Sequence, residues 1–249
     1  RIQEDFMMTR VMKTMATALI ALMLMLAAVP VMAKDYAVTE DKRVQLYLPE
    51  KATATSYPDR GHLGKEYPER GRYTYFLGNL YSSDGKPIKN IKITAKSSNN
   101  KVATVKLEKD KDGTAFISVE PKKAGVTTIK VTVNGKIYQT KYTVKKYINP
   151  VSSIKVGKTN IKGASFNKTG VYTLKYSQYA NKKMNVKINL KKGWKLQWGV
   201  EYAQKSWAKY DGIKNGAALK ISGRKGFVIN AMVKNTKTGQ EEEVAVYFK

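Results

Sequence analysis

Apolar and polar residues alternate along most of the chain after residue 34. In 91–96, three apolar residues alternate with lysine and threonine, and the same two-residue period recurs in 129–133 and 186–191. Successive side chains of a strand point to opposite faces, so this period is typical of antiparallel sheets with one face in solvent. The pattern predicts an all-β chain.

Short turn motifs separate the predicted strands. Asp84-Gly85, Asp112-Gly113 and Asn134-Gly135 supply the glycine that tight hairpins need. Short strands at this spacing favour β-sandwiches. In the first half, strands are predicted near 43–48, 72–81, 88–97, 102–108, 114–120, 126–133 and 136–144. In the second half, they are predicted near 153–156, 170–177, 184–190, 194–202, 217–222, 226–234 and 242–248.

The segment 96–144 carries a more specific motif. It contains Ser-Asn-x-x-Val-Ala-Thr-Val over 98–105, then Ala124-Gly125 and the Asn134-Gly135 turn. This segment resembles the bacterial immunoglobulin-like domain, group 2, a module of surface and adhesion proteins. The resemblance covers roughly residues 40 to 145. It implies a sandwich fold and a surface location, and it supplies no binding residues.

Residues 147–150, Tyr-Ile-Asn-Pro, interrupt the strand pattern. Proline cannot donate to a β-ladder, and a short segment between two strand-rich blocks is a natural domain boundary. We therefore expect two tandem antiparallel Ig-like β-sandwich domains, over 35–146 and 151–249. The second assignment depends on the strand pattern alone.

The first 33 residues predict a cleavable export signal. Arg10 and Lys13 precede an apolar run over 15–32, which ends in small or β-branched residues before Lys34. A retained membrane anchor is the alternative, because about eighteen apolar residues can just span a bilayer. Pro30 and the small residues favour cleavage. The expected location is therefore extracellular or at the cell surface, without a retained transmembrane anchor.

The true start of translation is open. The chain begins with arginine, so residues 1–7 read as an upstream extension, with Met7, Met8 or Met12 as the start.

The chain is strongly basic, with 46 Lys and Arg against 19 Asp and Glu and a net charge of +27. Without residues 1–33, about +26 remains, more than solubility requires. Lysines at outward strand positions could simply be solvated and discourage edge-to-edge aggregation. Alternatively, they bind a polyanion. Few of the cations are arginine, which disfavours sequence-specific nucleic-acid recognition. The expected partner is an anionic cell-surface polymer, a glycan or another surface protein.

Catalysis finds little support in the sequence. There is no cysteine, so the fold must be held by packing without disulfides. His62, the single histidine, lies in a polar loop and cannot form a histidine-based metal cluster. Phosphate-cradling and nucleophile-elbow motifs are also lacking. The remaining possibility for catalysis is a pair of carboxylates that the fold brings together. The acidic residues are, however, single or in runs expected to be exposed, such as 241–243. We expect no enzyme activity, no cofactor and no metal.

A five-residue unit, Tyr-Pro-(Asp/Glu)-Arg-Gly, occurs at 57–61 and again at 67–71. It indicates either a turn-rich loop that closes the first sandwich or a binding loop at its end, where sandwiches commonly carry recognition. A calcium site would need more oxygen ligands than this loop offers. The candidate ligand-binding residues are Tyr57, Arg60, Tyr67 and Arg70.

Aromatic residues gather in 194–210. Large rings dominate sandwich cores, so a core stripe explains the spacing, whereas an exposed stripe would form a platform for sugar rings. Trp207 and Tyr210 are further ligand-binding candidates, because 206–212 reads as a loop after the strand. The stripe consists of Trp194, Leu196, Trp198, Val200 and Tyr202.

These observations predict a secreted, non-catalytic bacterial cell-surface binding or spacer protein, retained on anionic surfaces by its charge. Two alternatives stay open. One is an assembly component that adds a strand at an open sheet edge. The other is a carbohydrate-binding module that uses loop aromatics.

Overall fold

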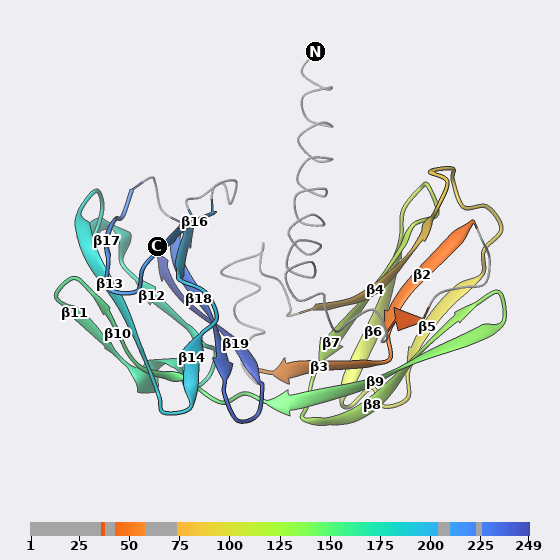
Figure 1. Cartoon of the computed structure of the whole chain (residues 1–249), viewed down its shortest axis with the longest axis horizontal. Helices are drawn as coiled ribbons and strands as arrows, with labels where there is room; N and C mark the ends of the chain where they lie inside the picture. Colours follow the sequence, from red (N-terminus) through yellow and green to blue (C-terminus); the bar gives the residue numbers. More distant parts are fainter. Residues whose placement is uncertain (1–35, 38–42, 58–73, 204–209, 223–225) are drawn as a thin grey trace, which may run out of the picture.

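The computed structural model describes residues 36–37, 43–57, 74–203, 210–222 and 226–249. These ranges are almost entirely strands and turns, with two short 3-10 helices and no α-helix, so the predicted all-β class is confirmed. Within the described part of the chain, no helix has the length and apolar character needed to cross a membrane. The predicted export signal lies outside the described residues. Figure 1 shows the strands gathered into two bodies side by side.

Strands β1 to β9 form the first sandwich. Their bounds are β1 (Tyr36–Ala37), β2 (Val44–Pro49), β3 (Lys51–Ser56), β4 (Tyr75–Ser82), β5 (Ile93–Ser97), β6 (Ala103–Lys109), β7 (Ala115–Pro121), β8 (Gly125–Val133) and β9 (Lys136–Lys146). One sheet has the order β1-β2-β4-β7-β6 and the other the order β3-β9-β8-β5. Neighbours are antiparallel, except that β3 runs parallel to β9.

This arrangement is that of the immunoglobulin fold. There, strands A, B, E and D form one sheet and strands C, F and G form the other. Here β2, β4, β7 and β6 take the places of the first set, and β5, β8 and β9 take those of the second. The predicted Ig-like sandwich is therefore confirmed for this half of the chain.

The core of the first sandwich follows the predicted alternation. Along β8, Ile129 and Val131 are buried, whereas Lys130 between them is exposed. Leu46 of β2 and Leu80 of β4 lie opposite each other and are also fully buried. Burial of each such side chain stabilises the fold by roughly 1.5–3 kcal/mol.

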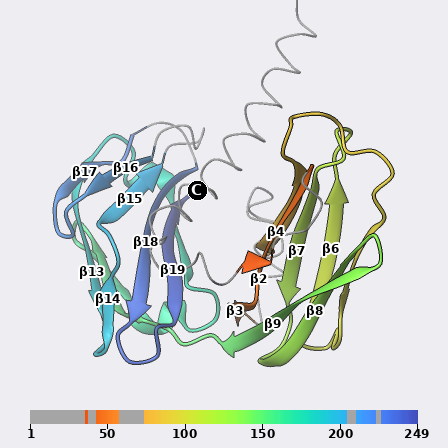
Figure 2. The same ribbon diagram turned by 45° about the vertical axis from the view of Figure 1, so that its right-hand side comes forward.

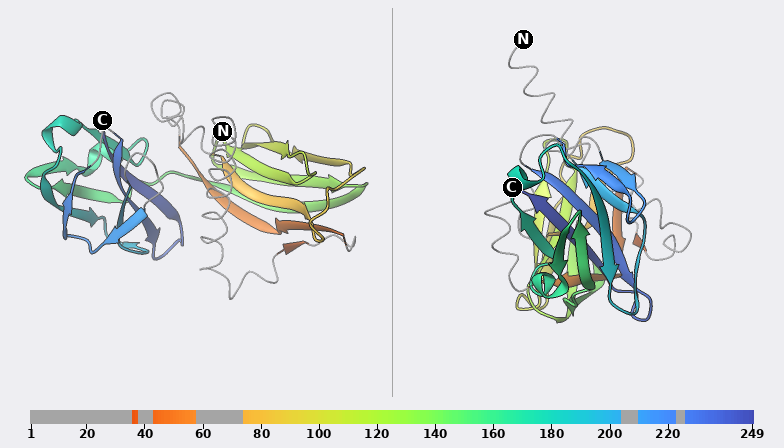
Figure 3. Two further views of the ribbon diagram at one scale, coloured as in Figure 1. Left: turned by 90° about the horizontal axis from the view of Figure 1, so that it is seen from above. Right: turned by 90° about the vertical axis from the view of Figure 1, so that its left-hand side faces the viewer.

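Strands β10 to β19 form the second sandwich. Their bounds are β10 (Val151–Val156), β11 (Thr159–Lys162), β12 (Val171–Leu174), β13 (Lys183–Leu190), β14 (Trp194–Leu196), β15 (Val200–Ala203), β16 (Tyr210–Ile213), β17 (Ala218–Lys220), β18 (Phe227–Asn235) and β19 (Glu241–Phe248), with the 3-10 helices η4 (Gly163–Phe166) and η5 (Tyr176–Gln178). The sheets are β11-β10-β13-β17 and β12-β19-β18-β15-β16, and β14 pairs with β18. An early strand, β12, again runs parallel to the last one, β19. Figures 2 and 3 show the two sandwiches arranged along the long axis of the molecule.

Several strand predictions need correction. The segment 51–56 is strand β3, which small residues form beside β9. The expected strand 88–97 is reduced to β5. Strands β11 and β16 were not predicted. The expected strand 194–202 is broken between β14 and β15, where Gly199 passes so close to β16 that an added Cβ would lie 2.7 Å from the Ile213 carbonyl oxygen.

Candidate functional site: lysine faces and the junction between the sandwiches

The second sandwich carries exposed lysines on the outer face of the sheet β11-β10-β13-β17. Two pairs lie directly opposite each other, Lys155 with Lys187 and Lys183 with Lys220. None of the four strands contains an acidic residue. We call this surface the second lysine face; it consists of Lys155, Lys162, Lys183, Lys187 and Lys220.

Like charges directly opposite each other on a sheet destabilise it by roughly 0.2–1 kcal/mol per pair. Within the described part of the chain, these five lysines make no ion pair that would offset the repulsion. A soluble sheet face does not require lysines opposite each other, because lysines on alternate strands would be solvated equally well. The arrangement is therefore suited to a ligand that brings several negative charges.

The first sandwich repeats the feature on its sheet β3-β9-β8-β5. Strands of this sheet also contain no acidic residue. Lys96 and Lys130 lie directly opposite each other, and Lys51 lies beside Lys141 in the parallel pair. These four exposed lysines form the first lysine face. Each sandwich therefore has one basic sheet without acids.

Acidic strand residues belong to the other sheet of each sandwich. In the first sandwich these are Glu108 and Glu120. In the second, Glu201 of β15 and the run 241–243 of β19 share one sheet. The acidic strand residues are thus confined to one sheet of each sandwich, where lysines such as Lys106 and Lys234 also lie, and the lysine faces have no acid on their own strands.

Crowding of the acids has an electrostatic effect at Glu201. Burial raises the pKa of this carboxyl, and the nearby Glu243 raises it further. Glu201 lies opposite Asn230, whose Nδ2 donates a hydrogen bond of 3.3 Å to Glu243 Oε1. Burial and the neighbouring carboxylate therefore both disfavour the charged form of Glu201.

We expect Glu201→Gln to raise the melting temperature at pH 7 and to leave it unchanged below about pH 3. Because the pKa is raised in the folded state, the folded chain holds the proton more tightly than the unfolded chain. Stability therefore falls as pH rises through the unfolded and then the folded pKa, and the glutamine variant escapes that loss. Thermal unfolding across pH measures the difference, with Glu50→Gln, an exposed carboxyl, as the control. A lower melting temperature of Glu201→Gln at pH 7 would contradict this account.

The junction between the sandwiches is built around Glu242, at the start of β19. This carboxylate is only 1% exposed. Its Oε1 accepts hydrogen bonds from Thr55 Oγ1 at 3.1 Å and from Gln240 Nε2 at 2.6 Å. Its Oε2 accepts a hydrogen bond from the Tyr57 hydroxyl. Thr55 and Tyr57 belong to the first sandwich or the segment following β3, so one buried acid joins the two halves.

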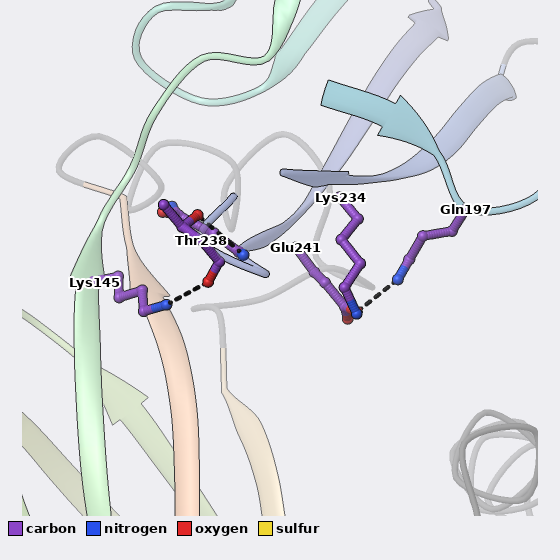
Figure 4. Close-up of polar contacts among 6 residues, drawn as sticks. Lys145, Gln197, Lys234, Thr238 and Glu241 are labelled. Atoms are coloured by element: carbon purple, nitrogen blue, oxygen red, sulfur yellow. Dashed lines mark hydrogen bonds and ion pairs between the residues drawn. The ribbon is translucent and has the colours of Figure 1, made fainter. Parts of the chain in front are cut away.

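Further contacts fasten the same region. Gln240 Nε2 also donates to the Lys146 carbonyl oxygen at 3.1 Å, and Lys145 Nζ approaches the Thr238 carbonyl oxygen at 3.4 Å. Figure 4 shows Lys145 reaching toward Thr238, and beside it Lys234 and Gln197 converging on Glu241. The β18–β19 hairpin is therefore tied to the end of β9.

The connecting segment is held as well. The Tyr147 ring packs on the Tyr57 ring, with centroids 4.7 Å apart, and its hydroxyl donates to the Phe166 carbonyl oxygen at 2.7 Å. Asn149 is buried and donates to the Gly163 carbonyl oxygen at 2.7 Å. The predicted linker is thus anchored in the second sandwich. These bonds favour a fixed arrangement of the two sandwiches.

A cleft of about 440 Å³ lies at this junction. Residues of both sandwiches line it, including the carboxylates Glu241 and Glu243 and the amine of Lys145. The other lining residues are Thr53, Ala54, Thr55, Tyr57, Tyr75, Met232, Thr238, Gly239 and Gln240.

Only part of the predicted loop site is described by the structure. Tyr57 is half-buried at the junction, where its ring and hydroxyl are already engaged. Arg60, Tyr67, Arg70, Trp207 and His62 lie outside the described residues. Tyr210 belongs to strand β16, opposite Ala203, and not to a loop as expected. The ligand-binding roles of these residues stay predictions.

The aromatic stripe is mainly core. Trp194, Leu196 and Tyr202 pack against the second core, and Val200 is fully buried within it. Trp198 is the exception, with 46% of its surface exposed in the break between β14 and β15. The alternative interpretation, an exposed aromatic platform along this strand, is therefore wrong.

Sequence reasoning missed the junction and the pairing of the lysines. The run 241–243 was expected to be exposed, but Glu242 shares the inward face of β19 with Val244 and Val246. Its position in that two-residue period was the available signal. The strand register that places one lysine opposite another cannot be read from the sequence of a single strand.

No protein-family model and no curated protein matches this chain. Among solved structures, it is similar to domains 4 and 5 of the S-layer protein SbsC, at 13% identity and a TM-score of 0.28, over 44% of this chain and 51% of that one. It is also similar to tandem Ig repeats of Dlar, at 10% identity and a TM-score of 0.33, over 83% and 98%. A third is the Yersinia pseudotuberculosis adhesin InvE, at 11% identity and a TM-score of 0.24, over 79% and 56%. The match spans about half the length of the SbsC fragment, and TM-scores this low identify neither a family nor a function.

Proposed function

We propose that this chain is a secreted, non-catalytic bacterial cell-surface module of two Ig-like sandwiches that binds anionic polymers through its lysine faces. The observation that carries the proposal is the pairing of lysine with lysine across strands that contain no acid. The same proposal includes membership of the first sandwich in group 2 of the bacterial Ig-like domains and an extracellular location. The resemblance of residues 40 to 145 implies both.

The chemistry of the faces favours a polymer of spaced negative charges. Lysine is a compact, flexible charge that meets sulfate, phosphate or carboxylate without a demand for one geometry. Ser153 and Asn189, hydrogen-bonded to each other at 2.9 Å on the same sheet, offer polar neighbours to such a chain. Recognition of this kind has low selectivity and high sensitivity to salt.

The junction between the sandwiches supports a spacer function. Two lysine faces on sandwiches held together by the Glu242 bonds bind one long polymer more tightly than either face alone, because the second contact forms within the complex. That gain depends on the sandwiches keeping a compatible spacing. A fixed junction therefore supports both the spacer and the binding function.

The test compares two variants with equal loss of charge. The face variant carries Lys155→Gln, Lys183→Gln and Lys187→Gln, and the control variant carries Lys89→Gln, Lys111→Gln and Lys237→Gln at exposed positions outside the strands. Binding to immobilised dextran sulfate is measured at about 50 and 300 mM salt.

We expect the parent to lose most of its affinity at the higher salt, as ion-pair binding does. At the lower salt, the face variant should bind at least about tenfold more weakly and the control variant within about threefold of the parent. Equal weakening of the two variants would show that the location of the charge is irrelevant. It would overturn the assignment of the lysine faces as the binding sites. Binding that resists salt would overturn the electrostatic mechanism.

A further inference from the structure

The first sandwich has a second distinctive surface, on the outer face of β2, β4 and β7. Four aromatic rings lie on it, with two amide side chains between them. Tyr47 is 37% and Phe76 39% exposed. We call this surface the aromatic face; it consists of Gln45, Tyr47, Phe76, Asn79, Tyr81 and Phe116, whose outward positions follow from the strand register.

The rings form two neighbouring pairs. Tyr47 and Tyr81 are stacked, with centroids 5.5 Å apart and planes within 2° of parallel. Phe76 and Phe116 are 6.4 Å apart and tilted by 55°. The pairs lie on adjacent strands, because Asn79 is opposite both Tyr47 and Phe116. The result is one continuous aromatic surface around Asn79.

The polar groups of this face are oriented by the tyrosines. Gln45 Oε1 accepts hydrogen bonds from Tyr81 OH at 2.8 Å and from Tyr47 OH at 3.4 Å, which turns the Gln45 amide nitrogen away from both hydroxyls. Burial, followed by the hydrogen bond with Tyr47, raises the pKa of Tyr81 to about 12, so this hydroxyl stays neutral. Within the described part of the chain, the Asn79 side chain makes no hydrogen bond, so it has capacity for a ligand.

A β-bulge in β4 brings these residues to one side. The pairing with β7 shifts between Phe76 and Gly78, so that Leu77 is an extra residue. In a regular strand, residues three apart such as Phe76 and Asn79 would point to opposite faces of the sheet, and the bulge places both on the same face. Bulges commonly re-aim side chains in this way.

The face is also uncharged, in contrast to the rest of the chain. Strands β2, β4 and β7 contain no lysine or arginine, and their one acid, Glu120, lies toward the end of β7. On the neighbouring strand β6, Lys106 and Glu108 border the face, but they form an ion pair with each other. Complementarity therefore favours a neutral ligand.

We infer that the aromatic face is a binding site for a neutral polysaccharide. The C–H groups of a pyranose ring carry partial positive charge and pack on the negative face of an aromatic ring. Amides of asparagine and glutamine donate to and accept from sugar hydroxyls. A row of rings with amides between them meets both demands. This site is independent of the lysine faces and of the function proposed for them.

The test is depletion of the protein from solution by three insoluble neutral polysaccharides, namely cellulose, chitin and starch. About 300 mM salt suppresses the contribution of the lysines. We expect at least one of the three to bind the parent, and the double variant Tyr47→Ala, Phe76→Ala to bind at least about fivefold more weakly. Ile137→Ala, which truncates an exposed apolar residue on the opposite sheet, should bind like the parent.

Asn79→Ala provides a variant that leaves all four rings and the core in place. It should also weaken binding, by about threefold, with the melting temperature of the parent. The face variant of the lysines should bind neutral polysaccharide like the parent, which separates this inference from the polyanion proposal. Failure of all three polysaccharides to bind the parent overturns the inference. So does binding that is equal in the parent, the double variant and Asn79→Ala.

Discussion

Glu242→Ala is expected to reduce the free energy of unfolding by about 3 kcal/mol and to loosen the two sandwiches from each other. The substitution leaves three donors, the Thr55 and Tyr57 hydroxyls and the Gln240 amide, without the carboxylate that they share. A buried donor that loses its acceptor costs roughly 1–3 kcal/mol. Because Glu242 is buried, water does not readily take its place.

Two measurements check this expectation. Urea unfolding followed by tryptophan fluorescence reports on the second sandwich, because all three tryptophans follow residue 193. Small-angle X-ray scattering reports on the spacing of the sandwiches and should show a larger maximum dimension. Glu241→Ala, next in sequence, removes a half-exposed ion pair with Lys234 and an exposed hydrogen bond from Gln197, and should cost less than about 1 kcal/mol. If the two variants are equally stable and equally compact, Glu242 does not hold the junction.

Gly78→Ala is expected to destabilise the first sandwich by about 3 kcal/mol. A Cβ added at Gly78 would lie 2.2 Å from the Tyr47 carbonyl oxygen, which is backbone and cannot rotate away. Strands β2 and β4 would have to separate, and their buried contacts between Leu46 and Leu80 would open. Overpacking of a tight core typically costs 1–3 kcal/mol, and more where backbone must move.

The matched control is Gly212→Ala. Nothing lies within 4 Å of a Cβ added there, so stability should change by less than about 0.5 kcal/mol. Urea unfolding followed by far-ultraviolet circular dichroism measures both variants. A Gly78→Ala variant as stable as the parent would mean that β2 and β4 are not packed as closely as the structure shows. The same variant should also lose binding to neutral polysaccharide, because the bulge beside Gly78 presents Phe76 and Asn79 together.

Local alternation was sufficient to predict most strands. Lys130 between two buried residues of β8 marks the solvent-exposed face of that strand in the sequence itself, and the same holds for Lys187 of β13. Strand β3 escaped prediction because Ala, Thr and Ser have little apolar contrast, and its pairing with β9 joins segments far apart in the sequence. Parallel pairing of this kind is set by tertiary structure, not by local pattern.

The candidate sites were less accessible from sequence. High net charge indicated a polyanion partner, but the opposition of Lys155 to Lys187 depends on strand register, which a single sequence does not display. The aromatic face depends on the same kind of information, because a bulge reverses the expected side of Phe76 relative to Asn79. Glu242 could have been placed inward from its two-residue spacing to Val244, although the adjoining acids suggested a solvated run.

The most direct test of the lysine faces measures stability and binding together, through the melting temperature at low salt with and without dextran sulfate. The variant carries Lys187→Gln and Lys220→Gln, which breaks both opposed pairs of the second lysine face. Without polymer, it should melt above the parent, because two repulsions are removed. With polymer, the parent should gain more than the variant, because a ligand stabilises the folded state in proportion to its affinity. Equal gains in the parent and the variant would contradict the proposed role of the lysine faces.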